Sequence, residues 1–277
     1  MMKSTQKNQR ADLFVLAECS IMIALSTVLS IFKIFEMPYG GSITIASMLP
    51  IAIVAYRHGI KAGVGTALTA SVIQMLLGLK NFSYFTTLTS FVALAVFDYV
   101  LAFGIFGIAG IFRNRVKGQN LALALGTLLA TLMRYVFHVF SGATVWAGLS
   151  IPTEAALIYS ISYNATYMIP ECIIHTLVAV YLGSALDFSK RIPTRKATEK
   201  LDTVSVYLYA GSGLAVLAGL IADTVLVFSK LQDSESGELV ITNIASVDFV
   251  TLALVTVAAA ATAVALALIA RHRSAVR

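Results

Sequence analysis

Polar side chains interrupt two neighbouring apolar stretches of the sequence, around residues 134–138 and 159–164. Arg134 and His138 are four residues apart, so on a helix they share one face. A charged side chain at the centre of a membrane costs roughly 3 kcal/mol on insertion scales unless a partner or a cavity compensates it. The pair therefore indicates a binding site or a transport pathway.

Aromatic and amide side chains gather next to this pair. Trp146 lies in the following connection, and Tyr159, Tyr163 and Asn164 open the next apolar segment. Aromatic faces stack on a flat ring and attract a cation, and an Asn amide both donates and accepts hydrogen bonds. This combination favours a flat, nitrogen-rich heteroaromatic ligand. The alternative is an aromatic belt that only marks the membrane interface.

Asp98 is a carboxylate deep inside the apolar stretch 85–112. At 1.5 Å per helical residue it lies about 22 Å from the end of that helix at Arg113, which places it in the outer half of a membrane. Arg134, His138 and Asn164 are expected at a similar depth, so all four can share one cavity. The alternative is a buried Asp98–Arg134 ion pair that only fixes helix packing.

Other ionisable residues are interpreted as structural. Glu171 and His175 are four residues apart and are expected to hydrogen-bond to each other within one helix, because one Glu and one His are too few ligands for a metal. Glu18 is expected to pair or to reach the membrane interface. Cys19 and Cys172 lie in apolar segments without the spacing of a metal or redox pair, so neither a disulfide nor a metal site is predicted.

These side chains need membrane helices to position them, and the composition predicts such helices. The 277 residues are 58% hydrophobic and only 12% charged, with a mean hydropathy of +0.85. We therefore expect a multi-pass protein of the cell membrane with an all-α helical bundle. The net charge of +6 does not indicate nucleic-acid binding, because the basic residues form short clusters between apolar segments.

Eight apolar segments can be counted, at about 13–35, 43–56, 62–79, 85–112, 120–141, 155–186, 205–228 and 247–270. If the N-terminus is cytoplasmic, sixteen of the twenty basic residues fall on the cytoplasmic side. Both termini are therefore predicted to be cytoplasmic. The second segment is too short to cross alone, and Pro50 within it predicts a break in its helix.

The predicted organisation has three parts: a six-helix substrate-binding core at 1–190, a basic cytoplasmic linker at 191–204, and a transmembrane hairpin with a basic tail at 205–277. Ser20 and Ala24 put two small residues on one helix face, a spacing that lets another membrane helix approach closely. The sequence has no ATP-binding, serine-hydrolase or metalloprotease motif, so no enzyme activity and no cofactor are predicted.

Three groups of residues resemble a known family, the thiamine-specific S components of energy-coupling factor (ECF) vitamin transporters. They are Gly41-Ser-Ile-Thr-Ile-Ala-Ser-Met-Leu-Pro-Ile51 with Ala55-Tyr-Arg-His-Gly-Ile-Lys-Ala-Gly63, Asp98-Tyr99 ahead of Gly107-Ile-Ala-Gly-Ile-Phe112, and Arg134-Tyr-Val-Phe-His138 with Gly142, Trp146 and Tyr159-Ser-Ile-Ser-Tyr-Asn164. The resemblance covers residues 13 to about 188. It implies a six-helix core that holds thiamine near the outer face and docks on a transmembrane coupling protein with two cytoplasmic ATPases.

The resemblance also implies roles for individual residues. His138, Trp146, Tyr159 and Asn164 match the family's contacts to the pyrimidine and the rings. Asp98 and Tyr99 match its Glu-Tyr pair beside the thiazolium, Arg134 matches a family Lys, and Ser20 and Ala24 match the small residues that contact the coupling protein. Asp98 is shorter than the family's Glu, and the 205–277 hairpin is additional.

Gly41 stands where the family has a stacking Trp, so a thiamine relative or precursor is an alternative ligand. A competing interpretation is a self-contained, proton-coupled secondary transporter for thiamine or a related small heteroaromatic cation. In it, Asp98, Glu171 and His175 would form the proton path.

Overall fold

The chain divides into two compact units, Met1–Lys196 and Ala197–Arg277. This computed structural model describes residues 2–37, 39–196, 203–231 and 240–275. The division falls inside the predicted linker 191–204, of which residues 197–202 lie outside the described residues. Each unit is a folded body of its own and is described separately.

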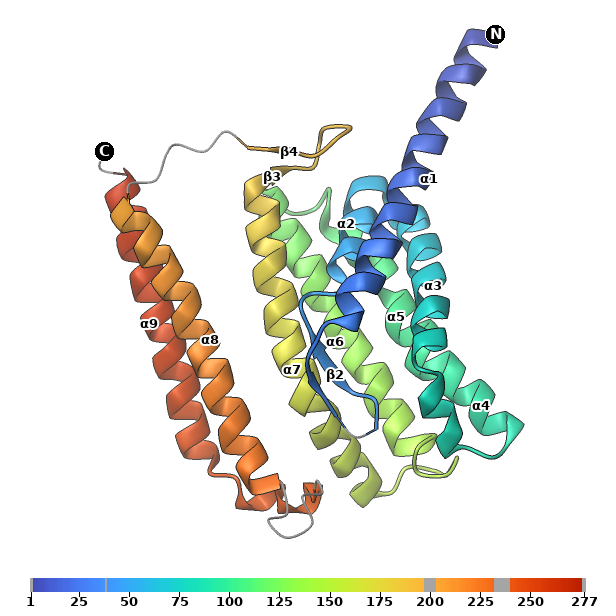
Figure 1. The fold of residues 1–277 in the computed structure, drawn as a ribbon, viewed down its shortest axis with the longest axis vertical. Coiled ribbons are helices and arrows are strands. Elements are labelled where there is room, and N and C mark those ends of the chain that lie inside the picture. Colours follow the sequence, from blue (N-terminus) through green and yellow to red (C-terminus); the bar gives the residue numbers. More distant parts are fainter. Residues whose placement is uncertain (1, 38, 197–202, 232–239, 276–277) are drawn as a thin grey trace. The chain divides into compact units, whose positions relative to one another are not determined.

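The first unit is built from helices with two short hairpins (Figure 1). In chain order its elements are α1 (Met2–Ile31), β1 (Lys33–Glu36), β2 (Ser42–Thr44), α2 (Leu49–His58), α3 (Ile60–Leu77), η1 (Leu79–Tyr84), α4 (Leu88–Leu94), η2 (Ala95–Leu101), α5 (Ala102–Gly104), η3 (Ile105–Phe112), α6 (Gln119–Thr144), α7 (Glu154–Ala185), β3 (Leu186–Asp187) and β4 (Thr194–Arg195).

Seven helical stretches among the described residues are long and apolar enough to cross a membrane. They are Asp12–Ile31, Ile60–Leu77, Leu88–Phe112, Gln119–Thr144, Glu154–Ala185, Thr203–Leu231 and Phe249–Arg273. The predicted all-α, multi-pass membrane architecture is therefore confirmed. The orientation of the two termini across the membrane stays a prediction.

The short second segment begins in one strand of a hairpin and continues as a short helix. Strands β1 and β2 are antiparallel, with Glu36 paired to Ser42 and Lys33 to Thr44. In Figure 1 this hairpin lies beyond the C-terminal end of α1, and α2 then lies against α1 and α3. With ten residues, α2 is about 15 Å long and cannot cross a bilayer alone, as expected.

Helix α2 is the centre of the core. Residues Leu49–Ala55 are all buried, because α1, α3, α6 and η3 surround them. The predicted break at Pro50 is wrong. Pro50 lies in the first turn of α2, where its missing amide proton costs no intrahelical hydrogen bond.

Close backbone approach packs η3 between α2 and α6. A Cβ on Gly110 would lie within 2.1 Å of the Ala55 carbonyl oxygen, and one on Gly126 would lie within 1.8 Å of the Ala109 carbonyl oxygen. Only glycine allows these helices to touch through their backbones.

A buried ion cluster joins α1 to α2 at the end of the unit where α7 also ends. Glu18 accepts hydrogen bonds from Arg57, whose NH1 also donates to the Phe188 carbonyl oxygen over 2.8 Å. The His58 Nε2 lies 2.8 Å from the same carboxylate. Glu18 is thus paired, as the sequence predicts, and it anchors α1 to the rest of the bundle.

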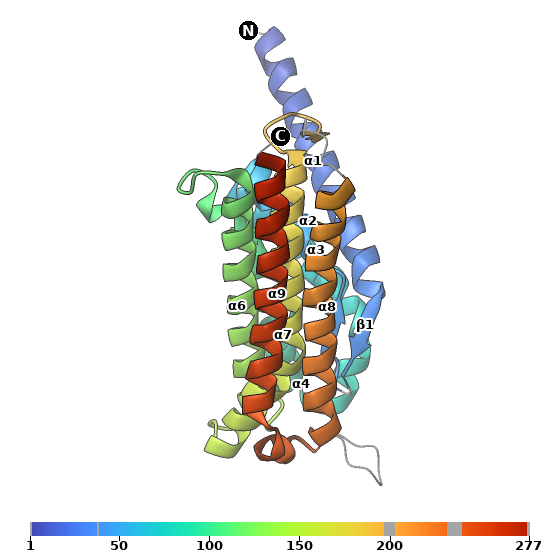
Figure 2. The same cartoon turned by 90° about the vertical axis from the view of Figure 1, so that its left-hand side faces the viewer.

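The second unit is a pair of antiparallel helices, α8 (Thr203–Leu231) and α9 (Phe249–Ala275), with the short helix η4 (Ile241–Ser246) between them. Figure 2 shows α8 and α9 side by side. The Ser212 hydroxyl donates to the Ala263 carbonyl oxygen over 2.8 Å, and Thr256 Oγ1 donates to Asp223 over 2.7 Å. Small residues and these two hydrogen bonds hold the helices together.

Candidate ligand cavity

A cavity of about 710 Å³ lies in the first unit, between the β1–β2 hairpin and helices α3, η2, α6 and α7. This size suits a small organic molecule. All eight site residues expected from the sequence line it: Asp98, Tyr99, Arg134, His138, Trp146, Tyr159, Tyr163 and Asn164. The expectation that residues from three apolar segments share one cavity is met.

Asp98 and Tyr99 come from η2, a π-helical turn inside the fourth apolar segment. Such turns are rare and frequent at functional sites, because the extra residue changes which side chains face inward. Tyr99 is buried, donates to the Gly78 carbonyl oxygen over 3.1 Å and accepts from Asn81 over 3.0 Å. Tyr99 thus joins η2 to the loop after α3.

Three donors surround the Asp98 carboxylate. Its Oδ1 lies 2.9 Å from His138 Nδ1, while its Oδ2 accepts from the Ser141 hydroxyl over 2.9 Å and from Trp146 Nε1 over 2.8 Å. No direct Asp98–Arg134 ion pair is present between these described residues, so that alternative is wrong. His138 lies between Asp98 and Arg134, and Arg134 donates to a different carboxylate.

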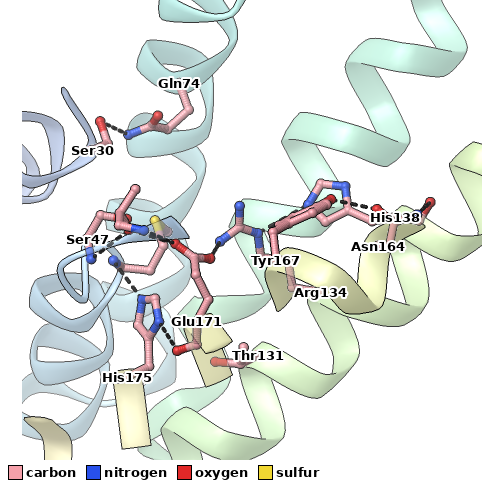
Figure 3. A network of polar contacts seen from close by, with 12 residues as sticks. Ser30, Ser47, Gln74, Thr131, Arg134, His138, Asn164, Tyr167, Glu171 and His175 are labelled. Carbon is pink, nitrogen blue, oxygen red and sulfur yellow. Dashed lines mark hydrogen bonds and ion pairs between the residues drawn. The ribbon is translucent and has the colours of Figure 1, made fainter. Parts of the chain in front are cut away.

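That carboxylate belongs to Glu171. Arg134 NH1 donates to Glu171 Oε2 over 2.9 Å (Figure 3). Its guanidinium lies 4.3 Å from the centre of the Phe103 ring. Arg134 Nε also lies 3.2 Å from His138 Nε2. Since a guanidinium can only donate, Nε2 accepts and the imidazole proton sits on Nδ1, facing Asp98.

The expected intrahelical hydrogen bond between Glu171 and His175 forms, but it uses the Glu171 backbone carbonyl and not its carboxylate. The Glu171 carboxylate accepts from the Thr44 amide over 3.2 Å and from the Thr44 hydroxyl over 2.6 Å. His175 Nδ1 donates to the Glu171 carbonyl oxygen over 2.7 Å, and its Nε2 accepts from the Met48 amide over 3.2 Å. The carboxylate therefore has its partners on β2 and α6.

The charges in this cluster do not cancel. Asp98 and Glu171 as carboxylates carry two negative charges, Arg134 carries one positive charge, and the His138 tautomer is neutral. This cluster of four residues therefore has a net charge of −1, located at Asp98, since Glu171 is paired with Arg134. The negative charge is local to Asp98 and attracts a positive charge placed beside it. Within the described residues no group of three or more His, Cys, Asp or Glu could hold a metal ion.

Aromatic rings close the cavity around Trp146. The centre of its ring system lies 5.0 Å from Phe85, 5.6 Å from Tyr84 and 6.2 Å from Tyr39, all in tilted or edge-on arrangements. Tyr39 belongs to the turn of the β1–β2 hairpin, and its amide donates to the Tyr163 hydroxyl over 3.2 Å. The hairpin thus contributes one wall of an aromatic cage.

The amide of Asn164 is engaged by the protein. Its Nδ2 donates to the Ser160 carbonyl oxygen over 2.9 Å, and its Oδ1 accepts from the Tyr167 hydroxyl. A ligand edge that reaches Asn164 must therefore share Oδ1 with Tyr167. Tyr159 stacks parallel to Tyr163 with ring centres 6.1 Å apart, but it remains 42% exposed at the rim.

Tyr167 also explains the glycine at position 41. A Cβ on Gly41 would lie 2.5 Å from the Tyr167 ring, so no larger side chain fits there unless Tyr167 moves. The space that a stacking side chain would need at position 41 is occupied from the opposite side, by α7.

Several residues of the cavity lining or of its hydrogen-bond network escaped the sequence analysis. Ser141 and Tyr167 lie at helical spacing from His138 and Asn164, on the same faces of α6 and α7, and this periodicity could have revealed them. Tyr39 and Thr44 could not have been found this way, because only the folding of the hairpin over the cavity brings them to α7.

The fold and the cavity define a class of protein: a multi-pass helical membrane protein with a cavity lined by aromatic and ionisable side chains. The family model described as thiamine transporter protein (Thia_YuaJ) matches residues 16–189, and the chain belongs to this family. It is 33% identical over 186 residues to the thiamine transporter ThiT of Bacillus subtilis (strain 168), covering 63% of this chain and 93% of that protein.

A solved structure of ThiT from Listeria monocytogenes has the same fold. The TM-score is 0.51 at 21% sequence identity, and the likeness covers 62% of this chain and 94% of that chain. The family match ends at residue 189, so the second unit lies beyond the part that the family shares.

Proposed function

We propose that this chain is the thiamine-binding membrane component of an ECF-type importer. It captures the vitamin at the outer face and delivers it through a partner module driven by ATP hydrolysis. The observation that carries the proposal is the cavity wall with one uncompensated carboxylate inside an aromatic cage. Thiamine has a matching shape and charge, because it joins a permanently cationic thiazolium to an aminopyrimidine.

Asp98 is the expected partner of the thiazolium. Arg134, which lies on the other side of His138, is held by Glu171, so the Asp98 charge is left for a ligand. Opposite charges attract more strongly in a cavity with apolar walls than in water. Trp146 donates to the same carboxylate, which places an aromatic surface directly beside the expected position of the cation.

The pyrimidine is expected at the other group of aromatic residues, near Tyr163, Asn164 and His138. Asn164 Oδ1 offers an acceptor to an amino group, and Tyr163 offers a ring face next to Tyr159. The Asp98, Tyr99 and Arg134 side chains complete the proposed site.

ATP hydrolysis is assigned to other chains, since this sequence has no phosphate-binding loop. The exposed face of α1 supports a partner contact. Ser20 and Ala24 are both exposed, and the Ser20 hydroxyl donates to the Leu16 carbonyl oxygen of its own helix over 3.0 Å. This face therefore carries small side chains, and the Ser20 hydroxyl already has an acceptor within its own helix. Such a face suits close packing against a transmembrane coupling protein that carries two ATPase subunits.

The proton-coupled alternative is less well supported. A proton path needs carboxylates that gain and lose protons, whereas Glu171 is held by a guanidinium that remains charged. His175 has both ring nitrogens engaged by backbone groups. These contacts suit a fixed wall better than a proton relay.

Titration with thiamine while Trp146 fluorescence is recorded tests the proposal, because Trp146 is the only tryptophan. We expect thiamine to quench the Trp146 fluorescence of the purified chain saturably, with no partner protein present. A Trp146→Phe variant measured by calorimetry separates loss of signal from loss of binding. Absence of saturable binding in both measurements would refute a thiamine site in this cavity.

A further inference from the structure

Glu171 is the most deeply buried carboxylate in the cavity wall, with 1% of its surface exposed. It contacts two different parts of the unit. One carboxylate oxygen accepts from Arg134 on α6, and the other accepts twice from Thr44 on β2. Its side chain therefore joins the helix that carries His138 to the hairpin that covers the cavity (Figure 3).

The contact with Arg134 leads toward Asp98. The carboxylate holds NH1, and this leaves Arg134 Nε pointing at His138 Nε2 at 3.2 Å. Because that nitrogen must then accept, the His138 proton is directed to Asp98 at 2.9 Å. Without the Glu171 charge, Arg134 is free to turn to Asp98, the next carboxylate along the chain of contacts, and to neutralise it.

The contact with Thr44 leads toward the aromatic cage. Since a carboxylate only accepts, the Thr44 hydroxyl proton and amide proton both go to Glu171, and Ser47 Oγ lies 2.8 Å from the same hydroxyl. Thr44 pairs with Lys33 across the hairpin, and the turn of this hairpin carries Tyr39 beside Trp146. Two hydrogen bonds to an ion therefore anchor the strand that places Tyr39.

We infer that Glu171 is a positioning residue for ligand binding: it keeps Asp98 charged and available through Arg134, and it seats the β1–β2 hairpin over the cavity through Thr44. This inference rests on the proposed function for its ligand. The seating of the hairpin is a property of the empty protein. The two parts can therefore be tested separately.

The first measurement is acrylamide quenching of Trp146 fluorescence without ligand. Glu171→Gln keeps the shape and removes the charge, and Thr44→Val keeps the shape and removes the hydroxyl. Both variants are expected to raise the quenching constant at least twofold, because Tyr39 no longer shields Trp146. The matched control is Thr131→Val on α6, whose buried hydroxyl bonds only within its own helix and whose loss should leave quenching unchanged.

The second measurement is thiamine affinity in a double-mutant cycle. Glu171→Gln and Thr44→Val are each expected to weaken binding at least tenfold, in line with the loss of hydrogen bonds to a charged group. The effects of Glu171→Gln and Asp98→Asn should be non-additive in affinity, because both act on one charge. Thr131→Val should combine additively with Asp98→Asn.

The outcomes separate the inference about Glu171 from the proposed thiamine-binding function. Wild-type quenching and wild-type affinity in both Glu171→Gln and Thr44→Val would overturn the inference and leave the proposed function intact. Failure of the wild-type protein to bind thiamine would overturn the proposed function, while quenching would still test the hairpin anchor. If Glu171→Gln does not fold, Thr44→Val alone decides: unchanged quenching overturns the inference, and increased quenching with weaker thiamine binding supports it.

Discussion

Arg134 Nε donates toward His138 Nε2 across 3.2 Å, and this contact fixes the direction of every hydrogen bond between Glu171 and Asp98. A guanidinium has no acceptor, so the imidazole must offer its lone pair to Arg134 and its proton to Asp98. Asp98 remains the carboxylate without a cationic partner in this cluster.

Asp98→Asn should weaken thiamine binding by about 2 kcal/mol, roughly thirtyfold, while an uncharged aminopyrimidine fragment loses little affinity. The substitution nearly preserves shape and removes the charge that faces the thiazolium. Calorimetric titration with both ligands measures the difference. Equal losses for the two ligands would mean that Asp98 only orders His138, Ser141 and Trp146.

Arg134→Met should destabilise the protein by about 3–5 kcal/mol, because it leaves Glu171 buried without its counter-charge. Thermal unfolding in detergent measures the loss. The double variant Arg134→Met/Glu171→Leu removes both charges and should recover a large part of it. If the double variant is less stable than Arg134→Met, the unpaired Glu171 charge is not the cause of the stability loss in Arg134→Met.

Gly41→Ala should cost about 1–3 kcal/mol through overpacking, because the added Cβ lies 2.5 Å from the Tyr167 ring. The loss should appear both in thermal unfolding and in thiamine affinity, since the hairpin turn is pushed away from α7. Tyr167→Ala is destabilising by itself but makes room, so Gly41→Ala should cost less stability in a Tyr167→Ala background than in the wild-type protein. A fully stable Gly41→Ala protein with normal affinity would show that the hairpin moves freely over the cavity.

Ala24→Phe should leave thiamine binding unchanged and reduce uptake more than tenfold, because the added ring prevents close helix approach. Radiolabelled uptake into vesicles that contain the chain, the coupling protein, both ATPases and ATP measures this. Leu25→Phe changes a neighbouring exposed position that is already large and serves as the control.

Uptake by the same vesicles should stop when ATP is omitted. Uptake driven by a proton gradient in vesicles that hold this chain alone would contradict the assigned role of the partners, whatever the result for Ala24→Phe.

The sequence by itself determined the membrane class and the main residues that line the cavity. Long apolar segments cannot be solvated by water, so they must become membrane helices, and the helical spacing of Arg134 and His138 puts them on one face. Polar residues among apolar ones then have to face a cavity or each other. These constraints are local, and they can be derived from the order of residues alone.

Only the tertiary structure decided which polar groups pair. Spacing favoured Glu171 with His175 and suggested Asp98 with Arg134, whereas the fold pairs Glu171 with Arg134 and places His138 beside Asp98. Hydrogen-bond partners depend on helix rotation and on the π-helical turn at Asp98, which the apolar pattern does not encode. The hairpin was equally hidden, because Thr44 and Tyr39 meet α7 across more than a hundred residues of chain.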